Sequence, residues 1–135
     1  MRNFLFFILL SFAVFAQSLK DGFYRVEEKG YTRGYKNFTE LTVSKGKITK
    51  VTFDKFDEKG ALVSENKDYN QRMKAASGID SVSANKILTD NLLKTQNSEK
   101  IDAVAGATSN VNIFKKQVNF LFEKAKSGKT GNYVD

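Results

Sequence analysis

The hydrophobic residues of this chain follow two different periods, and this change constrains the fold more than any other feature. Residues 38–54 contain two alternating runs joined at residues 45–47. They predict a β-hairpin, with a bulge or a late strand start after Ile48, where the alternation slips. From residue 80 onward apolar residues recur every three or four positions, as in amphipathic helices. Strands followed by helices predict an α+β fold, a small antiparallel sheet covered by helices.

Turn and cap residues divide the rest of the chain into short elements. The expected elements are a strand at 22–27, helices at 69–76, 81–95 and 111–125, and a loose tail or edge strand at 129–135. Residues 55–66 are polar and predict a loop. The nearby carboxylates Asp54, Asp57 and Glu58 lack the alternate spacing of a calcium loop, so we expect a solvated turn there.

The first sixteen residues have the layout of a secretory signal peptide. A positively charged start precedes the apolar run 4–15, and small residues precede an expected cleavage after Ala16. The run is shorter than the roughly 20 residues that a spanning helix needs, and no cysteine follows it for lipid attachment. We therefore expect an exported, periplasmic or extracellular protein without a stable membrane anchor, whose single domain is residues 17–135.

The composition excludes several kinds of chemistry. The chain has no cysteine and no histidine, which rules out disulfides, thiolate zinc sites, iron–sulfur clusters, c-type haem attachment and a histidine general base. No metal site is expected. The formal net charge of +7, from 22 Lys and Arg against 15 Asp and Glu, favours anionic ligands or acidic surfaces as partners.

The segment 101–110 carries the chemistry that remains. Ala105, Gly106 and Ala107 have little bulk, and Thr108, Ser109 and Asn110 follow them at the expected start of a helix. Free N–H groups and the helix dipole make such a start favourable for a phosphate. The same residues also fit an ordinary helix cap after a tight turn.

The segment 102–108, Asp-Ala-Val-Ala-Gly-Ala-Thr, resembles the flavinylation motif of the FMN-binding domain family. This family includes electron-carrying subunits of the sodium-pumping NADH:quinone reductase and of Rnf complexes, and small exported flavoproteins of bacterial extracellular electron transfer. Residues 21–24, 43–51 and 69–78 resemble further family segments in the same order. Two departures concern the branch of the family: Ala105 stands where the membrane-complex subunits often have Ser or Thr, and the lipoprotein cysteine is absent.

The resemblance implies a covalent cofactor. In the family a separate flavin transferase moves FMN from FAD onto the motif threonine, here Thr108, through a phosphodiester bond. The chain would then be an electron carrier rather than an enzyme, and its partners would be the transferase and membrane or surface redox proteins. The neighbouring Ser109 is the second choice for the bond.

The other motif residues receive supporting roles from the same resemblance. Asp102 would help the transferase recognise the loop, or would orient the loop itself. Small residues would leave room for the phosphate and ribityl chain at Ala105, Gly106 and Ala107. Candidates for the wall beside the flavin ring are Tyr24, Tyr69 and Met73, each of which also fits an ordinary core position.

Two other functions stay open from the sequence. The chain would serve equally as the electron-input module of an extracytoplasmic reductase, which only partner binding distinguishes from a free carrier. It would also fit a cofactor-free basic secreted protein that binds anionic surface polymers. Nucleic-acid binding is disfavoured, because export argues against it and the lysines are dispersed along the chain.

Overall fold

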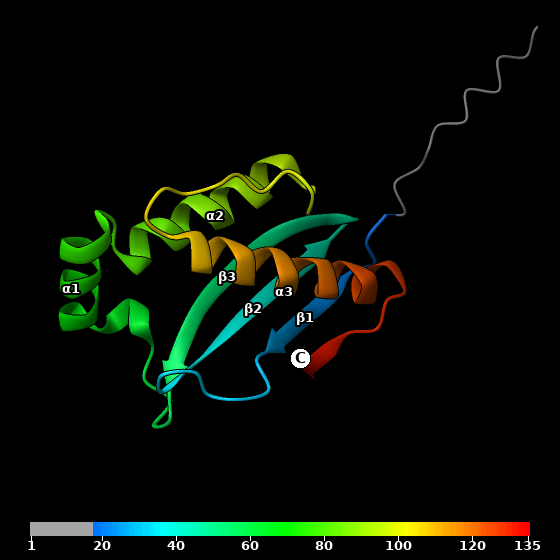
Figure 1. The fold of residues 1–135 in the computed structure, drawn as a ribbon. Coiled ribbons are helices and arrows are strands. Elements are labelled where there is room, and N and C mark those ends of the chain that lie inside the picture. The colour runs from blue at the N-terminus through cyan, green and yellow to red at the C-terminus, as the bar shows by residue number, and fades with distance from the viewer. Residues whose placement is uncertain (1–17) are drawn as a thin grey trace, which may run out of the picture.

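The computed structural model describes residues 18–135, so the expected signal peptide, residues 1–16, lies outside the described residues. A four-stranded sheet in the order β3-β2-β1-β4 forms one layer, and helices form the other (Figure 1). The elements are β1 (Gly22–Glu27), β2 (Tyr35–Ser44), β3 (Lys47–Asp57), a 3-10 turn (Val63–Glu65), α1 (Lys67–Ser77), α2 (Ser81–Thr95), α3 (Thr108–Lys126) and β4 (Gly131–Val134). The α+β class is confirmed.

The sheet is mixed rather than purely antiparallel. β1 pairs antiparallel with β2, and β2 with β3, but β4 pairs parallel with β1, from Tyr24 opposite Gly131 onward. The direction of α3 explains this pairing: Lys20 N donates to Ala125 O at 2.8 Å, so α3 ends where β1 begins. A short turn after α3 then starts β4 beside the start of β1. The expected edge strand is confirmed. Its four residues alone do not indicate whether it pairs parallel or antiparallel with its neighbour.

The hairpin between β2 and β3 has the turn and the bulge that the sequence predicts. Lys45 and Gly46 have φ values of 52° and 77°, as in the two-residue turns that match the twist of antiparallel strands. Val43 pairs with Ile48 and Thr42 with Lys50. Thr49 is therefore the extra residue of the bulge, which corrects the phase of the apolar side chains along β3.

Replacing Lys45 by Asn should raise the free energy of unfolding by about 0.5–1 kcal/mol, because asparagine tolerates positive φ better than lysine does. Urea unfolding of both proteins measures the gain. Lys45→Ala is the control, since it removes the same charge while keeping an unfavourable residue at positive φ. An equal gain in the alanine variant would show that charge, rather than backbone conformation, is responsible.

Side chains cap the starts of α1 and α2. Asn66 Oδ1 accepts from Tyr69 N at 3.0 Å, so α1 begins two residues before the predicted helix. Asp80 Oδ1 accepts from Ser83 N at 2.7 Å, and α2 begins at Ser81, the first residue of the predicted helix. That backbone hydrogen bond lowers the pKa of Asp80 from its ordinary value. No helix within residues 18–135 is long and apolar enough to cross a membrane.

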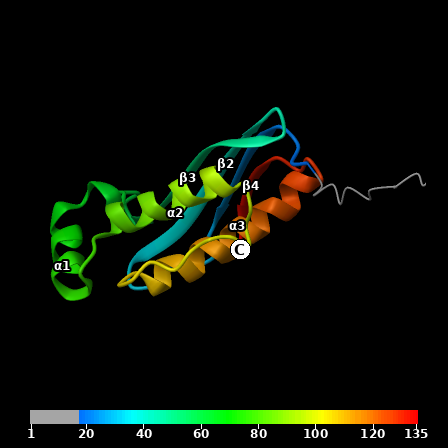
Figure 2. The ribbon, with the colours of Figure 1, turned by 90° about the horizontal axis from the view of Figure 1, so that it is seen from above.

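The predicted apolar stripe of α3 forms the core. α2 and α3 lie on one side of the sheet (Figure 2), and Phe114 is fully buried with its ring centroid 5.0 Å from that of Phe53. The other buried apolar residues of α3 are Val111, Val118, Leu121, Phe122 and Ala125. The amphipathic helix predicted here is confirmed, and its apolar face lies in the core.

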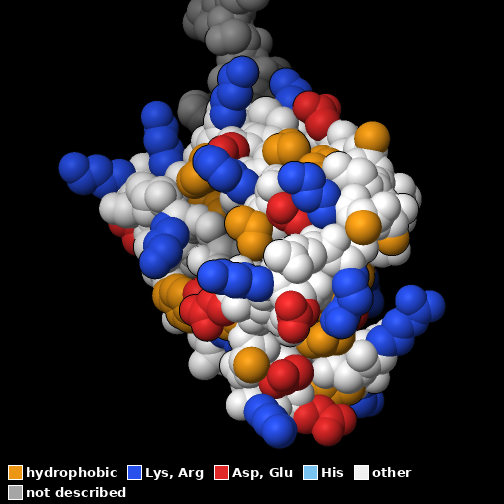
Figure 3. All heavy atoms as spheres, turned by 90° about the vertical axis from the view of Figure 1, so that its left-hand side faces the viewer, with side chains coloured by type: hydrophobic (Ala, Val, Ile, Leu, Met, Phe, Trp, Pro, Cys, Tyr) orange, Lys and Arg blue, Asp and Glu red, His pale blue; other side chains and the backbone are white. Residues whose placement is uncertain are grey.

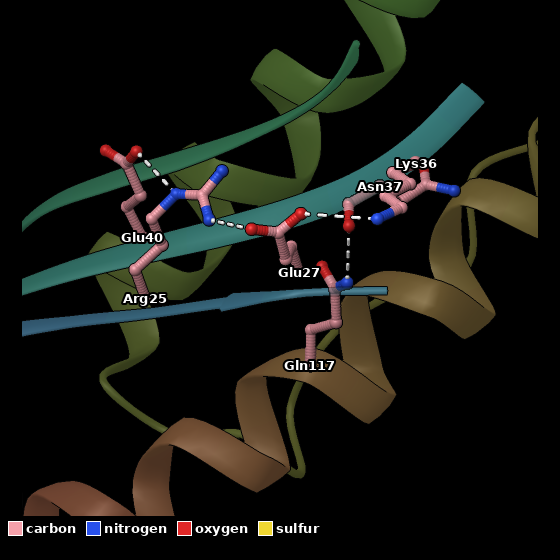
Figure 4. Close-up of polar contacts among 6 residues, drawn as sticks. All are labelled: Arg25, Glu27, Lys36, Asn37, Glu40 and Gln117. Atoms are coloured by element: carbon pink, nitrogen blue, oxygen red, sulfur yellow. Dashed lines mark hydrogen bonds and ion pairs between the residues drawn. The ribbon is translucent and has the colours of Figure 1, made fainter. Parts of the chain in front are cut away.

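Ion pairs cover the opposite face of the sheet. The guanidinium of Arg25 lies 4.8 Å from the ring centroid of Phe38, which is 6% exposed although it faces away from the helices. Arg25 also pairs with Glu27 at 3.1 Å and with Glu40 at 3.4 Å (Figure 4). The aliphatic and planar parts of Arg25 therefore shield an aromatic ring while its charge stays paired.

The carboxylates after the hairpin differ from the solvated turn that was expected. β3 continues to Asp57, and Asp54 is 6% exposed. Its Oδ1 accepts from Lys55 N at 2.8 Å and from Ser64 N at 3.2 Å, which ties the end of β3 to the following 3-10 turn. Asp57 does organise a turn, since its Oδ1 accepts from Lys59 N and Ala61 N at 2.9 Å each.

Candidate functional site

The start of α3 has no side-chain cap, unlike the starts of α1 and α2. Its N-cap residue is Ala107, which has no side-chain acceptor, and Thr108 is the first helical residue. The preceding turn is closed by a hydrogen bond from Ala107 N to Val104 O at 3.1 Å. The alternative interpretation of this segment, an ordinary side-chain cap at the start of the helix, is therefore not what the structure shows. An uncapped helix start offers N–H groups and a positive dipole end to an anion.

The two hydroxyl residues at this start are accessible. Thr108 and Ser109 are both exposed, whereas the flanking Ala107 and Val111 are buried. Buried residues on both sides anchor the first turn of α3 to the core. The Thr108 hydroxyl is thus held on a fixed backbone while remaining open to another protein.

A pocket of about 490 Å³ lies beside this first turn. Ser109 and Asn110 form one wall, and the rings of Tyr35 and Tyr69, with centroids 5.5 Å apart, form part of another. The remaining lining residues are Glu28, Thr32, Arg33, Asn37, Lys55 and Ile113. Its volume lies within the range of small-molecule and cofactor sites, about 300–1,000 Å³.

The three candidates for the ring wall fall in different places. Tyr69, on α1, lines the pocket. Met73, one turn further along α1, is partly buried and packs against the core, and it does not line the pocket.

Tyr24 lies at the other end of the molecule, where its hydroxyl donates to Lys20 O at 2.8 Å. Lys20 in turn contacts the end of α3, and Tyr24 is 0% exposed. Burial raises the pKa of the Tyr24 hydroxyl. The structure therefore gives Tyr24 a core position and does not bring it to the pocket.

The small residues of the loop are required by packing. A Cβ on Gly106 would lie 2.2 Å from the carbonyl oxygen of Ser77, at the end of α1, and Gly106 has a φ of +83°. Ala107 is 3% exposed and belongs to the core, whereas Ala105 is exposed. On the side of its missing Cβ, Gly106 therefore packs against the end of α1, although the residue is exposed, and Ala107 packs in the core.

Asp102 is exposed, and its Oδ2 accepts from Asn91 Nδ2 of α2 at 3.4 Å. This contact is compatible with a role for Asp102 in orienting the loop. Because the carboxylate is exposed, another protein could also contact it.

Sequence reasoning missed the far wall of the pocket and the contacts that hold Asn110. Asn110 Nδ2 donates to Asn85 Oδ1 at 3.0 Å, and Asn85 Nδ2 donates to Phe53 O at 3.1 Å. Alternation along β3 could have predicted the position of Lys55. Phe53 faces the helices, and the residue two positions further along a strand lies on the same face. Tyr35 carried no comparable signal, since it follows an irregular turn.

The opening segment 21–24 has a structural role. Asp21 Oδ1 accepts from Gly46 N at 3.0 Å, which joins this segment to the turn of the hairpin. The backbone hydrogen bonds from Gly46 and Lys45 lower the pKa of Asp21. A Cβ on Gly22 would lie 2.3 Å from Thr130 Cγ2, before β4. Two segments of the family resemblance therefore meet in the fold, away from the pocket.

Comparisons with known proteins agree with this architecture. The chain is 34% identical over 112 residues to the 15 kDa lipoprotein of Treponema pallidum (strain Nichols), covering 82% of this chain and 79% of the relative. The crystal structure of the CPE2226 protein from Clostridium perfringens superimposes with a TM-score of 0.82 at 39% identity, covering 87% of this chain and 97% of that one. A Clostridium thermocellum protein solved by NMR shares the fold, with a TM-score of 0.55 at 20% identity, covering 79% of this chain and 92% of that one.

The FMN-binding domain family matches residues 34–123. This range contains both Thr108 and the pocket walls from Tyr35, Lys55 and Tyr69. The chain belongs to the FMN-binding domain family.

Proposed function

We propose that this protein is an exported electron carrier with FMN attached to Thr108 through a phosphodiester bond. The proposal depends on one observation, the position of Thr108 in the structure. The family match spans the motif residues 102–108, and there an exposed threonine begins an uncapped helix beside a pocket of about 490 Å³.

The residues of the site fit the chemical parts of FMN. The free N–H groups of the first turn of α3 would hold the phosphate. Tyr35 and Tyr69 offer aromatic surface to the ring, and Ser109 and Asn110 offer polar groups to the chain between ring and phosphate. FMN supplies transfer of one or two electrons when bound, and the protein supplies its position and electrostatic environment.

The attachment reaction needs a partner protein. The Thr108 oxygen forms a bond to the FMN phosphorus of FAD, the pyrophosphate bond breaks, AMP leaves and the hydroxyl proton is released, with no net oxidation or reduction. A threonine hydroxyl is a weak nucleophile without a base, and the chain has no histidine. The flavin transferase would supply the activation, so the accessible position of Thr108 suits a substrate of that enzyme.

Export gives the covalent bond a physical purpose. The T. pallidum relative is a lipoprotein, and residues 1–16 have the layout of a signal peptide. Outside the cytoplasm a dissociated FMN would be lost to dilution, whereas a tethered one keeps a high effective concentration at its own pocket. Membrane or surface redox proteins would be the electron donor and acceptor.

The intact mass of the exported protein tests the proposal. Co-expression with a flavin transferase should add the mass of one FMN less one water to wild type and to Ser109→Ala, and nothing to Thr108→Ala. Ser109→Ala is the matched control, because it removes the neighbouring exposed hydroxyl. Unmodified wild type from cells in which a known substrate is flavinylated would refute the proposal and would favour the cofactor-free alternative.

A further inference from the structure

Lys55 lies between two tyrosine rings in the pocket beside the first turn of α3. Ser109 and Asn110 of that turn line the pocket, whereas Thr108 does not. Lys55 Nζ donates to the Tyr69 hydroxyl. It lies 4.6 Å from the ring centroid of Tyr69 and 5.3 Å from that of Tyr35. The two tyrosines therefore hold the ammonium group in one place by a hydrogen bond and by cation–π attraction.

The strand geometry separates Lys55 from the carboxylate next to it. Lys55 pairs with Asn37 on the helix-facing side of the sheet, whereas Asp54 pairs with Phe38 on the other side. Asp54 Oδ1 accepts hydrogen bonds from the backbone N–H groups of Lys55 and Ser64. Alternation along β3 thus brings the positive charge of Lys55 into the pocket and leaves the negative charge of Asp54 outside it.

No carboxylate within residues 18–135 lies within 4.0 Å of the Lys55 ammonium. Lys36, Lys86 and Lys116, by contrast, each form an ion pair. A partly buried cation without a counter-ion is costly unless a ligand supplies the negative charge. The arrangement is therefore prepared for an anionic group in the pocket.

The other charged residues of the pocket are less suited to this task. Arg33 is exposed and lies on a tight turn at a φ of 53°. Glu28 also lines the pocket, but its Oε1 accepts from both the backbone N and Nδ2 of Asn37. Lys55 is thus the cation that the surrounding side chains fix inside the pocket.

We propose that Lys55, positioned by Tyr35 and Tyr69, stabilises the negative charge that the flavin ring gains on reduction and thereby raises its midpoint potential. This inference rests on the proposed function. A fixed, partly buried positive charge favours the more negative form of a neighbouring group. Lys55 would act on the ring directly, and Tyr35 and Tyr69 are the residues that position it.

The midpoint potential of flavinylated variants tests the inference, with loading measured by intact mass. Lys55→Met removes the charge and keeps the length of the side chain. It should lower the potential by about 30 mV or more, a tenfold change in the equilibrium constant of a two-electron couple. Lys55→Arg should keep most of the wild-type potential.

Lys36→Met is the matched control. Lys36 also lies over a tyrosine, with its Nζ 4.6 Å from the ring centroid of Tyr31. It is on the opposite face of the sheet, paired with Glu27 at 3.9 Å (Figure 4). The control loses the same charge and should leave the potential near that of wild type.

The outcomes separate this inference from the proposed function. A loaded Lys55→Met protein with the wild-type potential, or an equal shift in Lys36→Met, overturns the role of Lys55 and leaves the carrier intact. Wild type that takes up no FMN overturns the proposed function itself. If Lys55→Met fails to fold or load, Lys55→Gln decides: it removes the charge but keeps a polar group that can bond to the Tyr69 hydroxyl. It should lower the potential, and an unchanged potential refutes the inference.

Discussion

Gly106→Ala should lower the free energy of unfolding by roughly 3 kcal/mol or displace α1 from the loop before Thr108. The new Cβ would lie 2.2 Å from the carbonyl oxygen of Ser77 and 3.3 Å from Ile79 Cγ2, at a φ of +83°. A backbone carbonyl at the end of a helix has little freedom to move aside. The substitution therefore adds a backbone penalty and a steric clash.

Gly78→Ala separates these two penalties. Gly78 follows α1 with a φ of +82°, and nothing lies within 4 Å of the position of its Cβ. We expect this variant to lose about 1 kcal/mol from conformation alone. Urea unfolding of both variants measures the difference, and equal losses would show that Ser77 yields without cost.

The clash should also affect the proposed cofactor site. Ser77 ends the helix that carries Tyr69, and Gly106 lies two residues before Thr108. Relieving the clash moves α1 and the loop apart, and with them a wall of the pocket and Thr108, the proposed attachment residue. Intact mass should therefore show less flavinylation in Gly106→Ala than in Gly78→Ala under the same expression conditions.

Local patterns in the sequence were enough to predict most of the fold. The slip after Ile48 predicts the bulge, and the period of three or four residues predicts α2 and the apolar face of α3. Each of these features depends on residues that are neighbours in the chain or in one helix. The parallel pairing of β4 depends instead on where α3 ends, which no local pattern records.

The candidate site was predictable only in part for the same reason. The loop before Thr108 is one continuous segment, whereas the pocket combines Tyr35, Lys55 and Tyr69 from three elements. The position of Asp21 beside the hairpin turn likewise follows from the tertiary fold. The sequence leaves Tyr24 open as a ring contact or a core residue, and only the tertiary fold shows that it packs in the core.

The surface around α1 adds little to the choice of partner. α1 has no buried residues and lies beyond the end of the sheet (Figure 1). Figure 3 shows this end of the molecule with Lys and Arg interspersed among Asp and Glu, and with only small, separated hydrophobic areas. Such a surface gives no single-sign field on this face. The contacts that line the pocket therefore say more about function than the charge of this surface does.

Asn85→Ala should lower the free energy of unfolding by about 2–3 kcal/mol, because it breaks the polar contacts that join α2, α3 and β3. Asn85 is 9% exposed, and its Nδ2 donates to Phe53 O at 3.1 Å and to Ser81 Oγ at 3.4 Å. Its Oδ1 accepts from Asn110 Nδ2 at 3.0 Å. Alanine would leave a strand carbonyl and the Asn110 amide without these partners.

The same contacts fix the first turn of α3, so the loss should reach the proposed flavin site. Asn110 is the third residue of α3, and its hydrogen bond to Asn85 anchors the turn that presents Thr108. Asn110→Ala is the matched control: it breaks one hydrogen bond at a partly exposed position and should cost about 1 kcal/mol. Urea unfolding and intact mass of both variants provide the measurements. Equal losses of stability in Asn85→Ala and Asn110→Ala would contradict this prediction. They would show that the hydrogen bonds of Asn85 to Phe53 and Ser81 add little stability beyond its hydrogen bond to Asn110.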